Sequence, residues 1–171
     1  MAYPQPRRSD TEAVQITVDW DLAFSQPATN KALSYWRSLC GAREMPERSE
    51  LRPQAMRAFL TYVNLVDVVA GPVSGSFEYR VSLQGQHARD LHGHVARRKL
   101  VEALPRQAEQ RWRYCFETVR QAARPARFRS LINGKQWLEG ELLVAPLGNE
   151  KTGVESLFCV LVSWRADGTV A

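Results

Sequence analysis

Residues 155–164, which read ESLFCVLVSW, decide the fold, because the side chains on both faces of this stretch are apolar. In an extended chain, successive side chains point to opposite faces. The apolar residues are Phe158, Val160 and Val162 on one face and Leu157, Cys159 and Leu161 on the other. A strand that is buried on both faces lies in the middle of its sheet. The sequence therefore predicts that this strand is central.

Two strands come directly before it and form a predicted hairpin. They read RFRSLI over residues 127–132 and KQWLEGELLVAPL over residues 135–147, and Asn133-Gly134 joins them. Asn-Gly is the strongest short hairpin signal, because a type I′ turn needs positive φ at both of its central positions.

A second hairpin is predicted from residues 62–69, YVNLVDVV, and the alternating residues 77–83, FEYRVSL. After Gly85 the pattern changes to short helical turns that are interrupted at Gly93, and a long helix begins near Pro105. Its apolar stripe consists of Ala108, Trp112, Cys115, Phe116, Val119 and Ala123. We expect this helix to lie across the sheet.

Helices are also predicted before the first strand. Apolar residues follow a helical period from Asn30, and Gly41 is a typical C-terminal stop. A second helix is predicted to begin near Pro53, with an apolar stripe of Met56, Phe59 and Leu60. The expected organisation is a polar tail over residues 1–27, a helical extension over 28–61 and a folded domain over 62–166.

The chain carries an excess of positive charge that is concentrated in one half. Its net charge is +5, and between Arg89 and Arg129 it holds 11 Lys and Arg against 4 Asp and Glu. Such a segment can attract a polyanion. On the long helix, however, Glu109, Arg113 and Glu117 follow one another at i, i+4 spacing, which favours ion pairs within the helix. We expect a solvated helix face, and nucleic acid is not an expected partner.

The location that the sequence predicts is the cytoplasm, with no membrane attachment. The longest apolar run, residues 157–162, is far too short to cross a bilayer, and no apolar segment follows the charges near the N-terminus. The cysteines are Cys40, Cys115 and Cys159. Because they are widely spaced and odd in number, reduced buried thiols are expected.

All three histidines lie between His87 and His94, which raises the question of a metal or catalytic site. His92 and His94 flank Gly93, so in an extended segment both could face one metal ion. No cysteine lies nearby, and Asp90 is the only close carboxylate. We assign no metal site, and His92 and His94 remain the candidates if one exists.

The motifs of the common enzyme families are absent, among them G-x-x-x-x-G-K-[ST], G-x-S-x-G and H-E-x-x-H. One pair of carboxylates stands out, because Glu139 and Glu141 are two residues apart on a predicted strand and share a face. We expect this face to be wet and to pair with nearby arginines, so no catalytic residue is assigned.

Several short motifs between residues 30 and 101 follow one another in a familiar order. In chain order they are Tyr35-Trp36, Met45-Pro46-Glu47-Arg48, Pro53, the strand at 63–68 with Asp67, then Phe77, Tyr79, Arg80, Gly85 and Gly93. In these motifs, and in the order of its elements, the chain resembles bacterial PAS domains of the PAS_5 type.

The resemblance implies an α+β fold with a five-stranded antiparallel sheet in the order 2-1-5-4-3, helices on one face and an N-terminal helical extension. It also implies a ligand cavity between the sheet and the helices. The candidate lining residues are Phe77, Tyr79, Trp112, Phe116, Trp137 and Phe158, with Arg80 as an anion partner at the rim.

The function that the resemblance implies is a non-enzymatic sensory or regulatory module, which binds a small ligand or a protein and signals by a change of shape or by dimerisation. Flavin photochemistry is not expected, because the Asn-Cys-Arg motif is absent. Haem would need an axial ligand such as His92 or His94. The second face of the sheet needs cover from the first helices, a second copy or both, so we expect a homodimer or a signalling partner.

Two rival functions remain open. A small cone-shaped α+β enzyme of the ketosteroid-isomerase or polyketide-cyclase kind would use Glu139, Glu141 or Asp67 as its base, and would need a carboxylate with a raised pKa. A nucleic-acid binder would use Arg97, Arg98 and Lys99, and its binding would depend on salt.

Overall fold

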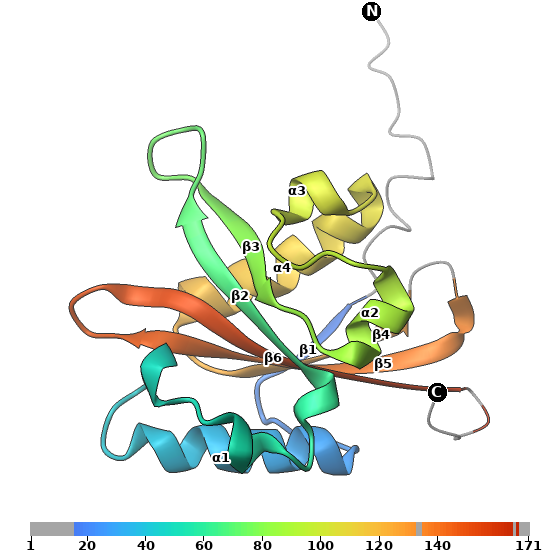
Figure 1. Ribbon diagram of the computed structural model, residues 1–171, viewed down its shortest axis with the longest axis horizontal. Helices are drawn as coiled ribbons and strands as arrows, with labels where there is room; N and C mark the ends of the chain where they lie inside the picture. The colour runs from blue at the N-terminus through green and yellow to red at the C-terminus, as the bar shows by residue number, and fades with distance from the viewer. Residues whose placement is uncertain (1–15, 133–134, 166, 168–171) are drawn as a thin grey trace, which may run out of the picture.

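An antiparallel sheet forms the centre of the computed structural model, which describes residues 16–132, 135–165 and 167 (Figure 1). Its strands are β1 (Thr17–Asp19), β2 (Val63–Ala70), β3 (Phe77–Leu83), β4 (Ala126–Ile132), β5 (Lys135–Asn149) and β6 (Gly153–Arg165). Across the sheet the order is β1-β4-β5-β6-β2-β3. Because β6 lies between β5 and β2, the prediction that the apolar run is central is confirmed.

The sheet has six strands in its described part, so the expected five-stranded sheet in the order 2-1-5-4-3 was wrong for the sheet as a whole. The additional strand is β1, which pairs with β4 through Thr17↔Arg129 and Asp19↔Arg127. It lies within residues 1–27, where we expected a tail. Three residues are too few to show an alternating pattern, so sequence alone does not reveal such a strand. The five remaining strands are neighbours in the order β3-β2-β6-β5-β4.

Both predicted hairpins are present as pairs of antiparallel strands. In the first, β4 and β5 pair up to Ile132↔Lys135, and the predicted Asn133-Gly134 turn itself lies outside the described residues. In the second, β2 and β3 pair from Ala70↔Phe77 to Leu65↔Leu83.

One face of the sheet is covered by α4 (Arg106–Ala122) together with the short helices α2 (Gln86–His92) and α3 (Leu100–Ala103) (Figure 1). The predicted long helix across the sheet is therefore confirmed. The buried residues of this first core include Val66, Tyr79, Cys115, Phe116, Val119, Phe128, Leu142, Leu157, Cys159 and Leu161. They come from every strand between β4 and β3, so α4 packs on the middle of the sheet.

The opposite face of the sheet is covered by α1 (Pro27–Cys40) and by the 3₁₀ turns η3 (Pro53–Met56) and η4 (Leu60–Tyr62). A further 3₁₀ turn, η2 (Arg48–Glu50), comes before them in the chain and has no buried residue. The second core includes Leu33, Trp36, Met56, Phe59, Leu143, Leu147, Phe158 and Val160. Cover by the chain's own first helices is thus the arrangement observed. In Figure 1, α1 lies on one side of the sheet and α2, α3 and α4 lie on the other.

The predicted second helix, by contrast, is a pair of 3₁₀ turns, η3 and η4, and not an α-helix. Met56 and Phe59 are buried as expected, while Leu60 is partly exposed. A 3₁₀ turn has three residues per turn, so two buried residues spaced three apart fit it well. The segment is also too short to gain much from helical cooperativity.

No helix in the described part of the chain combines the length and the apolar character needed to span a membrane.

Candidate functional site

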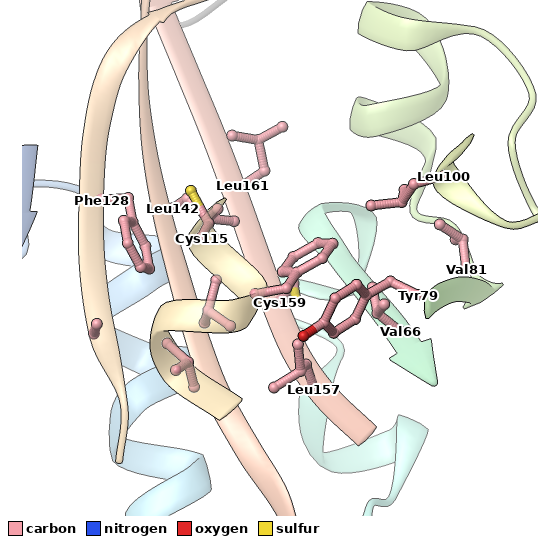
Figure 2. Close-up of a cluster of buried hydrophobic side chains, with 14 of the residues drawn as sticks. Val66, Tyr79, Val81, Leu100, Cys115, Phe128, Leu142, Leu157, Cys159 and Leu161 are labelled. Carbon is pink, nitrogen blue, oxygen red and sulfur yellow. The ribbon is translucent and has the colours of Figure 1, made fainter. Parts of the chain in front are cut away.

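Two small cavities lie between α4 and the sheet, inside the first core. The first has a volume of about 60 Å³ and is lined by Ile16, His92, Ala108, Arg111, Trp112, Cys115, Phe128, Ser130, Gly140, Leu142 and Leu161. The second has a volume of about 40 Å³ and is lined by Asn64, Val66, Val81, Gln84, Ala88, His92, Val95, Leu100, Leu104, Trp112, Phe116 and Cys159. Most of these side chains are apolar. Figure 2 shows part of this lining, with Phe128 and Leu142 at one end and Val81 and Leu100 at the other.

His92 and Trp112 line both cavities and stand between them. Their rings meet edge to face, with centroids 5.5 Å apart and an angle of 85° between the planes. Trp112 also packs against Phe116, at a centroid distance of 5.7 Å. His92 is the last residue of α2, which ends at Gly93 with φ of 75°. The two side chains between the cavities therefore come from one long helix, α4, and one short helix, α2.

Two of the predicted pocket residues line these cavities, and a third packs against one of those two. Trp112 lines both, Phe116 lines the second, and Tyr79 packs against Phe116 at a centroid distance of 5.4 Å. Tyr79 is fully buried, and its hydroxyl donates to Glu117 at 2.6 Å. Burial and the nearby Glu117 carboxylate raise the pKa of Tyr79 well above its usual value, so the hydroxyl stays protonated.

The other predicted pocket residues lie elsewhere. Phe158 is buried in the second core, under α1, because its side chain points to the opposite face of the sheet from Leu157 and Cys159. Phe77 is partly exposed under the guanidinium of Arg120, 4.0 Å from the ring centroid. Trp137 belongs to β5, but its side chain lies outside the described residues.

Arg80 does not reach either cavity. Its guanidinium pairs with Asp67 at 3.3 Å, and Asp67 is also bonded to Arg48. Since a carboxylate already neutralises this exposed arginine, its expected role as the anion partner at the cavity rim is not what the geometry favours.

Arg111 is the cationic residue at the first cavity, and the sequence analysis missed it. Its side chain donates a hydrogen bond to Ser130 Oγ at 2.6 Å. Burial lowers the pKa of Arg111 from its usual value, although the guanidinium remains charged at neutral pH. One sequence signal was available, because Arg111 precedes Cys115 by four residues and therefore shares the apolar face of α4.

The histidines do not form one cluster. His92 stands between the cavities, His94 is exposed, and His87 lies against β6. Nε2 of His87 accepts a hydrogen bond from the backbone N–H of Ser163 at 3.2 Å, and burial lowers the pKa of His87. Among the described residues, no group of three His, Cys, Asp or Glu side chains could hold a metal ion.

The carboxylates named for the rival enzyme are all paired with arginines. Glu139 pairs with Arg129 at 3.0 Å, and Glu141 pairs with Arg127 at 2.7 Å. The expectation of a wet face was wrong for Glu141, which is fully buried, whereas the pairing with arginines is confirmed. The net effect of its surroundings is to lower the pKa of Glu141, and a general base in an apolar pocket would need a raised pKa.

Two cysteines contribute to the cavity walls, Cys115 to the first and Cys159 to the second. Burial raises the pKa of Cys115 to about 12, and that of Cys159 well above its usual value. Both are therefore neutral thiols, and neither has the lowered pKa of a reactive cysteine.

The basic residues that a nucleic-acid binder would use lie between α2 and α3. Arg97 and Arg98 are exposed, and Arg98 donates a hydrogen bond to the backbone oxygen of Glu102 at 2.6 Å. The ion pair predicted within the long helix is confirmed for Glu109 with Arg113, and Glu117 pairs with Arg120 three residues further on. Nucleic-acid binding stays an open question for Arg97, Arg98 and Lys99.

An antiparallel sheet crossed by a long helix, with short helices closing small cavities beside it, is the arrangement that the sequence motifs implied. A family model described as PAS domain matches residues 24–162. The chain belongs to the PAS domain family. The match begins before α1 and ends within β6, so it includes residues of both the expected helical extension and the expected folded domain. No curated protein matches the chain.

The solved structure of an RNA-binding light-oxygen-voltage receptor is similar to this PAS domain. The two chains are 18% identical, and the TM-score is 0.41. The match covers 71% of this chain and 36% of the receptor chain, so this PAS domain spans about a third of that receptor. At this TM-score the likeness does not extend to function, and RNA binding is a property of that receptor.

Proposed function

We propose that this PAS domain is a non-enzymatic sensory or regulatory module that binds a small molecule between α4 and the sheet. The observation that carries the proposal is the pair of apolar cavities divided by His92 and Trp112. Ligand sites are concave, mostly apolar and furnished with a few polar groups, and both cavities have this character. Each is smaller than a typical cofactor pocket of about 300 Å³ or more, so the fit is to a small ligand.

The short helices provide a route by which a bound ligand changes the surface. Gly85 is the residue before α2. Its backbone packs so closely against the backbone of Thr61 that an added Cβ would lie 2.5 Å from the Thr61 oxygen. Gln84, which precedes α2, is bonded to the segment that follows the helix. Its Nε2 donates to the backbone oxygen of Gly93, and its Oε1 accepts from the backbone N–H of Val95. A ligand that moves His92 away from Trp112 would therefore displace α2 and the connection after it, while the sheet stays in place.

The second face of the sheet, which was predicted to need cover, is not free to bind a second copy or a signalling partner. Trp36 is buried and donates from Nε1 to the oxygen of Pro146 at 3.0 Å. The second face of β6 is covered by α1. A second copy or another protein would therefore contact residues outside this packed layer, and light scattering after size exclusion would measure whether the chain dimerises.

Native mass spectrometry of the freshly purified full chain tests the proposal of a cavity ligand. We expect a mass above that of the chain, which is lost under denaturing conditions. In the Ala108→Leu variant the larger side chain fills the first cavity, so the extra mass should decrease or disappear. Ala122→Leu is the matched control, because Ala122 is exposed at the end of the same helix and should leave the extra mass unchanged. If the wild type and Ala108→Leu each show only the mass of their own bare chain, the result would count against a ligand in this cavity.

A further inference from the structure

A wide groove with mostly apolar walls lies at the margin of the sheet, beside the layer that α1 covers. It has a volume of about 630 Å³, and its apolar lining includes Leu51, Pro53, Met56, Leu60, Leu65 and Leu83. These residues come from the 3₁₀ turns and the segment between them, from β2 and from the end of β3. We propose that this groove is a docking site for another protein, and that the segment it binds is an amphipathic helix with carboxylates beside its apolar stripe.

Two leucines of the groove are incompletely covered by the chain itself. Leu60 is 36% exposed and Leu83 is 40% exposed, although both line the same groove. Beneath them, Met56, Val63 and Leu65 are buried members of the second core, so the floor of the groove is part of a packed layer. Covering the two leucines removes apolar area from water, which is favourable in proportion to the area covered. Apolar surface gathered in this way is typical of a protein interaction site.

The shape of the groove fits a segment of a protein better than a small molecule. Arg48, Pro53, Thr61 and Gln86 all line it and are all exposed, so its rim is open to solvent. A small-molecule site encloses most of the surface of its ligand. An open groove with a buried floor instead receives a row of side chains from one side, as when an amphipathic helix lies in a hydrophobic groove.

The neighbouring edge of the sheet is already occupied, which disfavours a partner that adds a strand. β3 is the edge strand and leads into α2 (Figure 1). The N–H of Val81 donates to the oxygen of Arg98 at 3.1 Å, and the oxygen of Val81 accepts from the N–H of Arg97 at 2.6 Å. The oxygen of Phe77 accepts from Arg113 at 3.0 Å. Because strand addition needs these backbone groups, the partner has to bind through side chains in the groove.

The charged residues around the groove favour a partner that carries carboxylates. Arg48 lines the groove and shares the carboxylate of Asp67 with Arg80, so two guanidinium groups face one acid. Arg52 and Arg57 flank η3 and are exposed. Glutamate or aspartate beside the apolar stripe of a partner would complement this positive rim, and such complementarity speeds association and selects the partner.

A second copy of this chain is a poorer occupant of the groove than an acidic partner. Glu50, the acid of η2, is already bonded to Arg43 at 2.7 Å. Two copies in contact through this surface would bring the same arginines together, and each chain has a net charge of +5. Like charges that face each other across an interface oppose binding.

The groove also adjoins the segment that a cavity ligand would move. Gly85 and Gln86 line it, and α2 begins at Gln86. Gln84 lines it as well and is bonded to Gly93 and Val95 beyond α2. A shift of α2 would therefore change the shape of the groove, so docking would respond to the state of the cavities. This link rests on the proposed function, whereas the docking site itself does not.

Three synthetic peptides of about 18 residues, long enough to form a helix, test the docking site on the full isotope-labelled chain. The acidic peptide carries leucines at i, i+3, i+4 and i+7 on a helix of alanine and glutamate. The basic peptide has lysine at each glutamate position, and the scrambled peptide has the acidic composition without the stripe. Fluorescence anisotropy measures the affinities, and ¹H–¹⁵N spectra locate the binding. We expect the acidic peptide to shift the amide signals of Leu60, Leu83 and Gln86, and both other peptides to bind at least about tenfold more weakly.

Two variants identify the groove as the site. Leu60→Ser and Leu83→Ser change exposed side chains and should each weaken binding of the acidic peptide by at least about tenfold. Val73→Ser is the matched control, because Val73 is an exposed apolar residue of the turn between β2 and β3 and does not line the groove. It should leave the affinity unchanged. The comparison of the three peptides on the wild type needs no variant.

Each other outcome overturns the proposed docking site. Equal affinity for the acidic and scrambled peptides would mean attraction by charge alone, and equal affinity for the acidic and basic peptides would remove the acidic class of partner. Binding that survives both leucine variants, or no shift of any groove signal, would show that the groove is not the site. A dimer in light scattering that Leu83→Ser dissociates would make a second copy the occupant. None of these results changes the mass that a cavity ligand adds, so the proposed function stands or fails separately.

Discussion

At the scale of single residues, Glu141 shows how a buried charge attaches the first helix to the sheet. Its carboxylate accepts hydrogen bonds from the backbone N–H groups of Ser25 and Gln26, the hydroxyls of Ser25 and Thr29, and Nε of Arg127, at 2.7 to 3.1 Å. Burial raises the pKa of Glu141, but these bonds together outweigh burial and lower the pKa below its usual value. The carboxylate is therefore ionised at neutral pH.

Replacement of this carboxylate should strongly destabilise the fold. In Glu141→Gln the buried guanidinium of Arg127 loses its closest charged partner, which costs about 3–5 kcal/mol in the free energy of unfolding. Glu139→Gln is the matched control, because the ion pair of Glu139 with Arg129 is exposed and contributes about 1 kcal/mol or less. Urea denaturation of both variants measures the difference, and equal losses would show that Glu141 contributes no more than a surface pair.

His87 connects α2 to the central strand, β6. Its Nε2 accepts from the backbone N–H of Ser163, and its ring packs edge to face against Tyr62 at a centroid distance of 5.1 Å. Of the charged groups near it, Asp90 acts to raise its pKa, but burial acts more strongly and lowers it. Protonation of Nε2 would remove the acceptor that Ser163 uses.

The stability of the chain should therefore depend on pH through His87. Because the pKa of His87 is lower in the folded chain than its ordinary value of 6.5, the unfolded chain binds more protons as the pH falls below 6.5. We expect stability to fall with pH below this value, and the decrease to be smaller in His87→Gln. Denaturation midpoints at several pH values for both proteins test this, and identical slopes would contradict it.

Residue patterns found some of the candidate site and missed the rest for a physical reason. Trp112 and Phe116 were predicted correctly because an amphipathic stripe indicates which face of a helix packs against a sheet. Phe158 was misplaced because a strand that is apolar on both faces does not say which face meets that helix. Arg111 was missed because a charged residue is expected to be solvated, although its spacing of four residues from Cys115 places it on the apolar face of α4.

At the scale of elements, α1 acts as the cover of the second face of the sheet. Leu33 and Trp36 belong to the second core with Phe158 and Val160. Leu39, on the same helix, is only partly buried. The helical period predicted this element well, whereas the 3₁₀ turns after it and the three-residue β1 depend on contacts with distant segments.

The contribution of α1 to stability can be measured with the same substitution, leucine to alanine, at a buried and at a partly buried position of this helix. Leu33→Ala leaves a cavity in the second core and should cost about 2–5 kcal/mol in the free energy of unfolding. Leu39→Ala changes helix propensity by the same amount but should cost about 1 kcal/mol or less. Chemical denaturation gives both values, and losses of similar size would mean that α1 does not pack as described.

At the scale of the whole molecule, the sheet divides the interior into two cores of different character. The second core is covered by α1 and the turns, and the first contains the two cavities beside His92 and Trp112. The wall of the first core is made partly of the short helices α2 and α3. We expect this wall to be the least stable part of the described core.

Hydrogen exchange on the full chain tests this difference. Amides in the middle of β6, which pair with β5 and β2, should exchange only through global unfolding. Amides of α2 and α3 should exchange at least about tenfold faster through local opening. Equal protection in α2 and β6 would contradict the idea that a ligand can move this wall without unfolding the sheet.

The sequence by itself determined that an all-apolar strand lies at the centre of an antiparallel sheet, that α4 crosses this sheet and that α1 precedes it. These features follow from local periodicity, because burial on one or two faces leaves a pattern of period 2 or 3.6 in the chain. Only the tertiary structure decided that α1 covers the second face, that β1 extends the sheet and that Arg111, and not Arg80, lines the first cavity. Each of these depends on which distant segments meet, and a contact between residues far apart in the chain leaves no periodic pattern in either of them.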